Sequence, residues 1–214
     1  MSKPWLQSYP EGVPAEISIE EYASVADIFD QSVCKFEDRP AYSNFGKTIT
    51  YKEVRQSTSQ MGAYLKHELG LEKGTRVAVM MPNLLQNPVA LFGILRAGLV
   101  VVNTNPLYTA RELKHQMKDS GAEAIIIVEN FCHVLEEVIE DTPIKHVIVT
   151  RMGDMLPFPK SAIVNFVVKR IKKMVPAYKL PGAVAFNKAL KLGSQHRFET
   201  VPTNHYDIAF LQYT

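Results

Sequence analysis

Residues with chemical reactivity are spread along this 214-residue sequence without a recognisable catalytic spacing. None of the six histidines forms an HxxxH or HExxH pair, the spacing that puts two zinc ligands on one face of a helix. The chain also lacks the GxSxG pentapeptide that exposes a nucleophilic serine at a strand-to-helix turn. The sequence therefore predicts no catalytic residue and no metal ligand. The histidines are His67, His115, His133, His146, His196 and His205.

Two glycines have the spacing of a phosphate-binding loop, but their surroundings argue against that function. Gly93 and Gly98 match the glycines of GxxxxGK(S/T), yet Leu99 stands where the motif requires lysine. The first glycine falls inside an apolar run of helical length and the second falls at its end. We therefore interpret the match as an accident of spacing. No GxGxxG motif occurs in the chain.

The composition is that of an ordinary globular protein, with 46% hydrophobic and 21% charged residues, enough for one large domain or two small ones. Cys34 and Cys132 lie far apart and outside any CxxC pair, which indicates a reducing compartment and no disulfide framework. The first residues show no apolar core of a secretory signal. These features predict a cytoplasmic protein.

The longest apolar passage, Arg76–Tyr108, is the centre of the predicted fold. Arg76–Met81 and Val100–Asn103 are β-branched runs and the expected strands. Val89–Ala97, closed by Gly98, is the expected helix between them. This order predicts a βαβ crossover in a parallel sheet covered on both faces. A transmembrane hairpin is the alternative, but polar residues interrupt the passage too often for about 20 apolar residues in a row.

The same pattern continues on both sides of this passage. Helix starts are predicted at Ser24, Thr50 and Thr109, because each is followed three residues later by an acidic residue. With further strands at Ala124–Val128 and His146–Thr150, the middle of the chain reads β-α-β-α-β-α-β. We therefore predict an α/β fold with a mostly parallel sheet covered by helices. The expected parts are an N-terminal arm (1–20), an α/β core (21–150), a basic amphipathic insertion (151–185) and a return to the core (186–214).

The chain ends in an unusual way for an α/β protein. Ile208–Tyr213 reads as another buried strand, and nothing follows to cover it. In such sheets ligands bind beyond the carboxyl end of a strand, where the next loop and helix N-terminus contact them. We therefore expect the chain to be the N-terminal portion of a longer protein.

Three segments resemble, in order and spacing, the core motifs of the adenylate-forming superfamily of acyl-CoA synthetases, peptide-synthetase adenylation domains and luciferases. Residues 49–54 (ITYKEV) are similar to the first motif, and Leu95–Gly98 leading to Asn103–Pro106 is similar to the second. Residues 209–214 (AFLQYT) are similar to the lead-in to the third, after which a phosphate loop rich in Gly, Ser and Thr is expected. Within the superfamily, residues 80–122 look most like bacterial long-chain fatty acyl-CoA ligases.

The resemblance implies the first part of the large N-terminal domain of an enzyme that activates a fatty acid with Mg-ATP. The acyl-adenylate would then react with CoA to give acyl-CoA and AMP, feeding fatty acid degradation. The implied cofactors are ATP, Mg²⁺ and CoA, and the implied partner is a long-chain fatty acid. Tyr213 and Thr214 match the start of the third motif and are assigned to the ATP site, although Tyr213 could instead fill the core as a strand-end aromatic. Without the downstream loop and lid lysine, the 214-residue chain is expected to be inactive alone.

The predicted insertion is strongly basic. From Met155 to Phe198 there are nine Lys or Arg and no Asp or Glu. The rest of the chain therefore holds 24 − 9 = 15 basic residues against 22 acidic ones and is acidic overall. Residues 161–175 have helical spacing, and a basic amphipathic helix suits an anionic membrane surface. The alternatives are a packed helix with a solvated basic side, or a basic rim that attracts CoA phosphates or a fatty carboxylate. The expected apolar side holds Ile163, Val164, Val167, Ile171, Met174 and Val175, and the expected polar side holds Asn165, Lys169, Arg170, Lys172 and Lys173.

Two other functions fit the same residues. One is a lipid-surface binding module without catalysis, and the other is an acyl-adenylate-forming ligase for a shorter or aromatic acid. Nucleic acid is disfavoured as a partner, because aromatic residues are sparse in the basic segment and the rest of the chain is acidic. Membrane contact would place the protein on the inner face of the cytoplasmic membrane. A homodimer is left open, and acyl chain length is not fixed.

Overall fold

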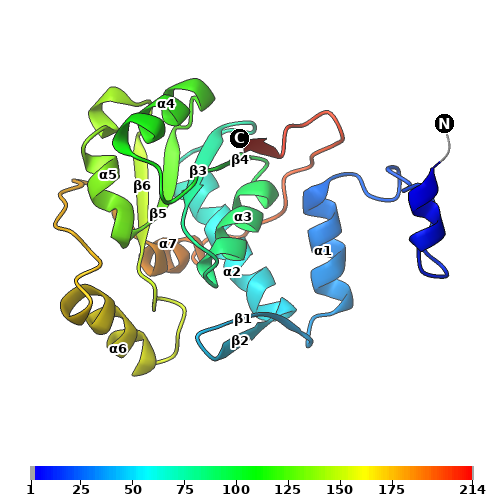
Figure 1. Cartoon of the computed structure of the whole chain (residues 1–214), viewed down its shortest axis with the longest axis horizontal. Helices are drawn as coiled ribbons and strands as arrows, with labels where there is room; N and C mark the ends of the chain where they lie inside the picture. Colours follow the sequence, from blue (N-terminus) through cyan, green and yellow to red (C-terminus); the bar gives the residue numbers. More distant parts are fainter. Residues whose placement is uncertain (1–2, 214) are drawn as a thin grey trace.

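A six-stranded parallel sheet forms the centre of the computed structural model, which describes residues 3–213 (Figure 1). The strand order is β7-β6-β5-β3-β4-β8, and every neighbouring pair is parallel. The predicted α/β fold is therefore confirmed. The strands are β3 (Arg76–Met80), β4 (Val100–Asn103), β5 (Ala124–Val128), β6 (His146–Thr150), β7 (Val184–Ala185) and β8 (Phe210–Gln212).

Helices cover both faces of this sheet because alternate strand residues point to opposite sides. Val77 and Val79 of β3 join the core cluster under one set of helices, and Ala78 and Met80 join the cluster under the other. The first face is covered by α2 (Tyr51–Ala63), α3 (Gln86–Arg96) and α7 (Phe186–Gly193), and the second by α4 (Ala110–Ser120) and α5 (Cys132–Glu136). Short turns extend these helices: a π-helical turn at Tyr64–Glu68 after α2, and 3-10 turns at Glu129–Phe131 and Ile139–Asp141 around α5.

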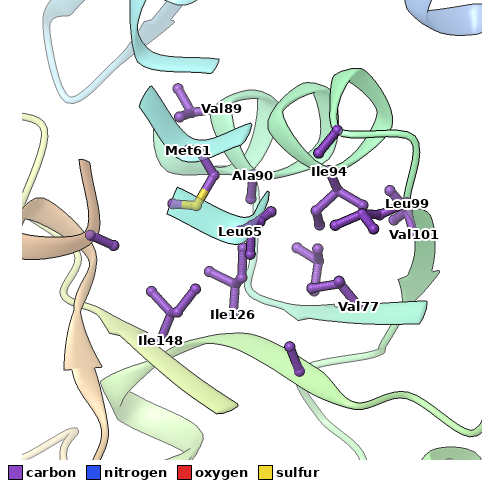
Figure 2. Close-up of a cluster of buried hydrophobic side chains, with 14 of the residues drawn as sticks. Met61, Leu65, Val77, Val89, Ala90, Ile94, Leu99, Val101, Ile126 and Ile148 are labelled. Atoms are coloured by element: carbon purple, nitrogen blue, oxygen red, sulfur yellow. The ribbon is translucent and has the colours of Figure 1, made fainter. Parts of the chain in front are cut away.

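The first face holds the larger core, shown in Figure 2. Met61 and Leu65, from α2 and the turn that follows it, and Ile94 of α3 point toward Val77 of β3 and Ile126 of β5, and all five side chains are fully buried. Gly93 lies inside α3, where a Cβ atom would stand 2.8 Å from the Met61 side chain. This glycine therefore allows two helices to approach closely, and the loop interpretation of the Gly93–Gly98 pair is excluded.

The predicted helix starts have the expected hydrogen bonds. The hydroxyls of Thr50 and Thr109 accept from the backbone N–H three residues later, and the acidic side chains there accept from the threonine N–H in return. Ser24 likewise begins α1 (Val25–Lys35), whose residues Phe29 and Val33 pack on a third core cluster. This cluster lies over the hairpin of β1 (Pro40–Asn44) and β2 (Lys47–Thr50).

The arm at the N-terminus contributes no buried residue over positions 3–20. It forms one 3-10 turn, Pro4–Ser8, and Figure 1 shows this turn standing apart from the sheet and its helices. Within residues 3–213, no helix combines the length and the apolarity needed to cross a bilayer.

The orientation predicted for the basic insertion is only partly correct: Val164, Val167 and Val175 are part-buried and Arg170, Lys172 and Lys173 are exposed as expected, but other positions differ. The segment forms α6 (Lys160–Phe166) and a π-helical turn, Val167–Ile171, and then leaves the helix. Asn165, expected on the solvent side, accepts a hydrogen bond from the Gly153 N–H at 2.7 Å. Lys169 reaches the carboxylate of Glu129, whose side chain is only 3% exposed. A buried carboxylate and a buried N–H both require partners, which Lys169 and Asn165 supply, although Lys169 itself stays half exposed. Ile163, Phe166, Ile171 and Met174 are 51–61% exposed instead.

The last strand also differs from its prediction. Ile208–Tyr213 was expected to be buried, but β8 contains only Phe210–Gln212 and lies at the edge of the sheet. Phe210 and Gln212 are exposed because β4 is the single neighbour of β8 in the described part of the chain.

Candidate functional site

A cavity of about 560 Å³ opens where β3, β4 and β8 end at the carboxyl edge of the sheet. This is the edge at which α/β sheets bind ligands, because the loops and helices that follow the strands surround it. A larger apolar hollow of about 780 Å³ lies near the starts of β3 and β4, at the opposite edge. We take the carboxyl-edge cavity as the candidate site. Its lining residues are Val79, Met81, Asn87, Asn103, Thr104, Asn105, Tyr108, Gln212 and Tyr213.

Side-chain amides join the two strands that form the floor of the cavity. Asn103 and Gln212 are register partners in the β4–β8 pair. The Asn103 Nδ2 donates to Gln212 Oε1 at 2.8 Å. Behind them, the Nε2 of Gln116 in α4 donates to the Asn103 carbonyl at 2.8 Å, and Gln116 is only 1% exposed. The carboxyl ends of both strands are thus held by hydrogen bonds besides the sheet ladder.

The loop after β4 is fixed by its own asparagine. The side-chain oxygen of Asn105 accepts from the Leu107 N–H at 3.0 Å, and its carbonyl accepts from the Tyr108 N–H at 3.1 Å. An Asx turn of this kind defines the backbone without a helix or strand. Thr104 is buried, and its N–H donates to the Val79 carbonyl of β3. The loop therefore keeps a set position above the cavity.

Tyr213, assigned to the ATP site from the sequence, lines this cavity. Its ring packs against the second core cluster, and its hydroxyl donates to Asp119 Oδ2 of α4 at 2.6 Å. Burial, followed by the hydrogen bond to this carboxylate, raises the pKa of Tyr213 to about 12. Tyr213 therefore borders the cavity, as the ATP-site assignment expects, and its ring also packs on the core, as the alternative of a strand-end aromatic expects. Its hydroxyl points toward α4. Thr214, the other assigned residue, lies outside the described residues.

The chemistry available in the cavity is binding. Its lining offers amide and hydroxyl groups that can donate to or accept from a polar ligand, and it includes no Asp, Glu, His, Cys, Lys or Arg. Over residues 3–213, no three His, Cys, Asp or Glu side chains cluster as ligands of a metal ion. The cavity lining itself supplies no carboxylate that could bind Mg²⁺.

Sequence reasoning missed several residues that build this site. Asn103 and Asn105 could have been found, since polar residues directly after a buried strand mark the carboxyl edge of the sheet. Asn87, Gln116 and Asp119 gave no such signal, because their positions depend on how α3 and α4 pack on the sheet.

The fold and this site define a class of protein. Residues 29–214 match the family model described as "AMP-binding enzyme", and the chain belongs to this family.

Among proteins of known function, the chain is similar to a long-chain-fatty-acid–CoA ligase of Escherichia coli O6:H1, with 54% identity over 217 residues. The match covers 100% of this chain and 38% of that ligase. Two crystal structures share the fold. An anthranilate CoA ligase in complex with anthranoyl-AMP has a TM-score of 0.73 at 18% identity, covering 92% of this chain and 34% of that protein. A long-chain-fatty-acid-CoA ligase from Archaeoglobus fulgidus has a TM-score of 0.71 at 22% identity, covering 96% and 37%.

Proposed function

We propose that this chain forms the first part of an ATP-dependent long-chain fatty acid–CoA ligase. The observation that carries the proposal is the 54% identity to the Escherichia coli ligase over the whole chain, within a family whose model also matches. The structure supports it with a polar, uncharged cavity at the carboxyl edge of the sheet, bordered by Tyr213. ATP and CoA would be used by the whole enzyme, with Mg²⁺ held by groups outside residues 3–213.

Within this proposal, the cavity is a scaffold for nucleotide binding. Residues that follow Tyr213 would wrap the phosphates with backbone N–H groups. The amides of Asn87, Asn103 and Asn105 would line the adjacent wall. The 214-residue chain alone is expected to show no ligase activity, because its cavity has no group that offsets phosphate charge.

Acid-dependent ATP–pyrophosphate exchange by the protein from the complete gene tests the proposal. Exchange stimulated by a long-chain fatty acid, such as palmitate, is expected. Exchange with benzoate and not with palmitate would favour an adenylate-forming ligase for aromatic acids. Absence of exchange with either acid, in protein that is folded, would overturn the assignment. The 214-residue chain serves as the inactive comparison.

We also propose that α6 and the turn after it touch a membrane surface peripherally. Ile163, Phe166 and Ile171 are more than half exposed, although large apolar side chains normally avoid water. Arg170, Lys172 and other basic residues flank them, and no acidic residue occurs from 155 to 198. Apolar side chains beside basic ones suit the boundary of an anionic bilayer. We do not include Lys169 among the residues proposed to touch the membrane, because it forms an ion pair with the buried Glu129.

Co-sedimentation with phosphatidylglycerol vesicles tests this second proposal. Arg170→Glu/Lys172→Glu is expected to weaken binding strongly, since each basic residue near the surface contributes about 1 kcal/mol. Lys188→Glu/Lys191→Glu, on exposed positions of α7 in the same basic segment, changes net charge equally and should have less effect. Phe166→Ser should weaken binding without changing charge. Equal binding by all variants would refute membrane contact by α6. The exposed apolar side chains would then be better explained by contact with another protein.

A further inference from the structure

The carboxyl end of β8 is held by few backbone hydrogen bonds in the described part of the chain. The strand has three residues and pairs only with β4 in the described chain, and a strand this short has few ladder hydrogen bonds. Phe210 and Gln212 are exposed. Side chains must therefore contribute to fixing the position of the residues that follow Gln212.

One face of α4 provides these contacts. Gln116 and Asp119 are three residues apart and so lie on the same side of the helix. The first donates to the carbonyl of Asn103, the β4 residue paired with Gln212, and the second accepts from the hydroxyl of Tyr213 at 2.6 Å. α4 thus reaches the last residue of β4 and the residue just after β8.

α4 is itself rigidly placed. Its N-terminus has a complete capping box, and its C-terminus ends at Gly121 in the left-handed conformation. Leu113 and Met117 are fully buried against the sheet. Because the helix is held in place, its side chains can fix the positions of the residues that they contact.

The buried amide of Gln116 also suggests a role beyond packing. Its Oε1 has no hydrogen-bond partner, which is unfavourable in a site that is only 1% exposed. An apolar residue there would avoid this penalty but would lose the hydrogen bond to the Asn103 carbonyl. The glutamine is explained if the position of the β4 end matters to function.

We propose that Asp119, supported by Gln116, is a positioning residue for nucleotide binding. Asp119 through Tyr213, and Gln116 through Asn103, set where the chain leaves β8, and so where the phosphate-binding residues begin. This inference rests on the proposed ligase function. Neither residue touches the cavity, so each acts through another residue.

Steady-state kinetics of the complete ligase test this role. Asp119→Ala and Tyr213→Phe are each expected to raise the KM for ATP about tenfold, the effect of losing one charge-assisted hydrogen bond. The KM for the fatty acid should stay unchanged. Asp119→Asn keeps an acceptor oxygen but not the charge, so its KM for ATP should fall between those of the parent and Asp119→Ala. The double variant Asp119→Ala/Tyr213→Phe should be no worse than either single change, because both remove the same contact. Asp141→Ala is the matched control, since it removes an ion pair to Lys114 of the same helix.

Amide hydrogen exchange on the 214-residue chain gives a second readout that does not depend on catalysis. Asp119→Ala should speed exchange at Phe210–Gln212, whereas Asp141→Ala should not. Unchanged exchange would overturn the positioning role. So would a KM for ATP no higher than that of Asp141→Ala, or equal effects on both substrates. If the complete protein shows no acid-dependent ATP–pyrophosphate exchange, the ligase assignment fails, and the nucleotide role of the Asp119–Tyr213 contact fails with it. Faster amide hydrogen exchange in Asp119→Ala would then show only that Asp119 holds the end of β8.

Discussion

Arg96 offers a quantitative test of how the chain is held together around the sheet. The residue lies in the last turn of α3, and its side chain is 7% exposed. Its Nε lies 2.8 Å from Asp30 Oδ1 of α1, and its Nη1 donates to the hydroxyls of Thr58 and Ser59 in α2. Nε also donates to Thr200, on the segment that leads to β8. One guanidinium therefore connects three helices and the returning chain.

Replacing Arg96 with alanine should lower the free energy of unfolding by about 3 kcal/mol. Removing one partner of a buried ion pair costs roughly 3–5 kcal/mol, and the lower end applies because the Asp30 side chain is 30% exposed and can be hydrated. Burial lowers the pKa of Arg96, and the charge of Asp30 opposes that shift. With a urea m-value of about 2–3 kcal/mol/M, the midpoint should fall by about 1–1.5 M.

Urea unfolding followed by circular dichroism measures this change. Arg96→Lys keeps the charge but not the planar set of donors, so it should fall between the parent and Arg96→Ala. Lys145→Ala is the control, because its ion pair with Glu123 is exposed and should contribute about 0–1 kcal/mol. A loss for Arg96→Ala no larger than for Lys145→Ala would refute the reasoning, as would additive losses in Arg96→Ala/Asp30→Ala.

Three further predictions concern single sites. Burial raises the pKa of the Cys132 thiol to about 12, whereas Cys34 is exposed. A thiol reagent at mildly alkaline pH should therefore label one cysteine in the native chain and two in denaturant. Cys34→Ser should abolish labelling of the native chain. Gly193→Ala would place a Cβ 1.8 Å from the Gln60 carbonyl oxygen and should destabilise the chain by about 1–3 kcal/mol in urea, whereas Ser194→Ala, one residue further, should change little. The pKa of Tyr213 is raised from 10.0 to about 12, so its protonated form is favoured by folding. The stabilisation is complete below pH 10 and is lost as pH rises through 12. Tyr213→Phe should remove one late-ionising tyrosine from the ultraviolet titration and reduce the alkaline loss of stability, and an unchanged titration would contradict the burial of this hydroxyl.

The sequence by itself determined the fold class and most of its elements. The period of the apolar residues in Arg76–Asn103 predicted strand, helix and strand, and each forms within a few residues of its predicted bounds. The helix starts at Thr50 and Thr109 were equally local, because a capping box uses residues three apart. Features that depend only on residues close together in the sequence can therefore be predicted without the tertiary structure.

Only the tertiary structure decided which side of α6 faces the domain. Helical spacing placed Asn165 and Lys169 on a solvent side, but Asn165 accepts from the buried Gly153 N–H and the half-exposed Lys169 reaches the buried carboxylate of Glu129. The burial of β8 was likewise mispredicted, because an apolar run does not reveal whether a strand is central or at an edge.

The candidate site shows the same division. Tyr213 was found from a motif in the chain, since motifs are local. Asp119, which receives its hydroxyl, is 94 residues away and carries no sequence signal. Their contact exists because α4 packs across the sheet beside β8, and packing between distant segments is the information that periodicity and spacing do not contain.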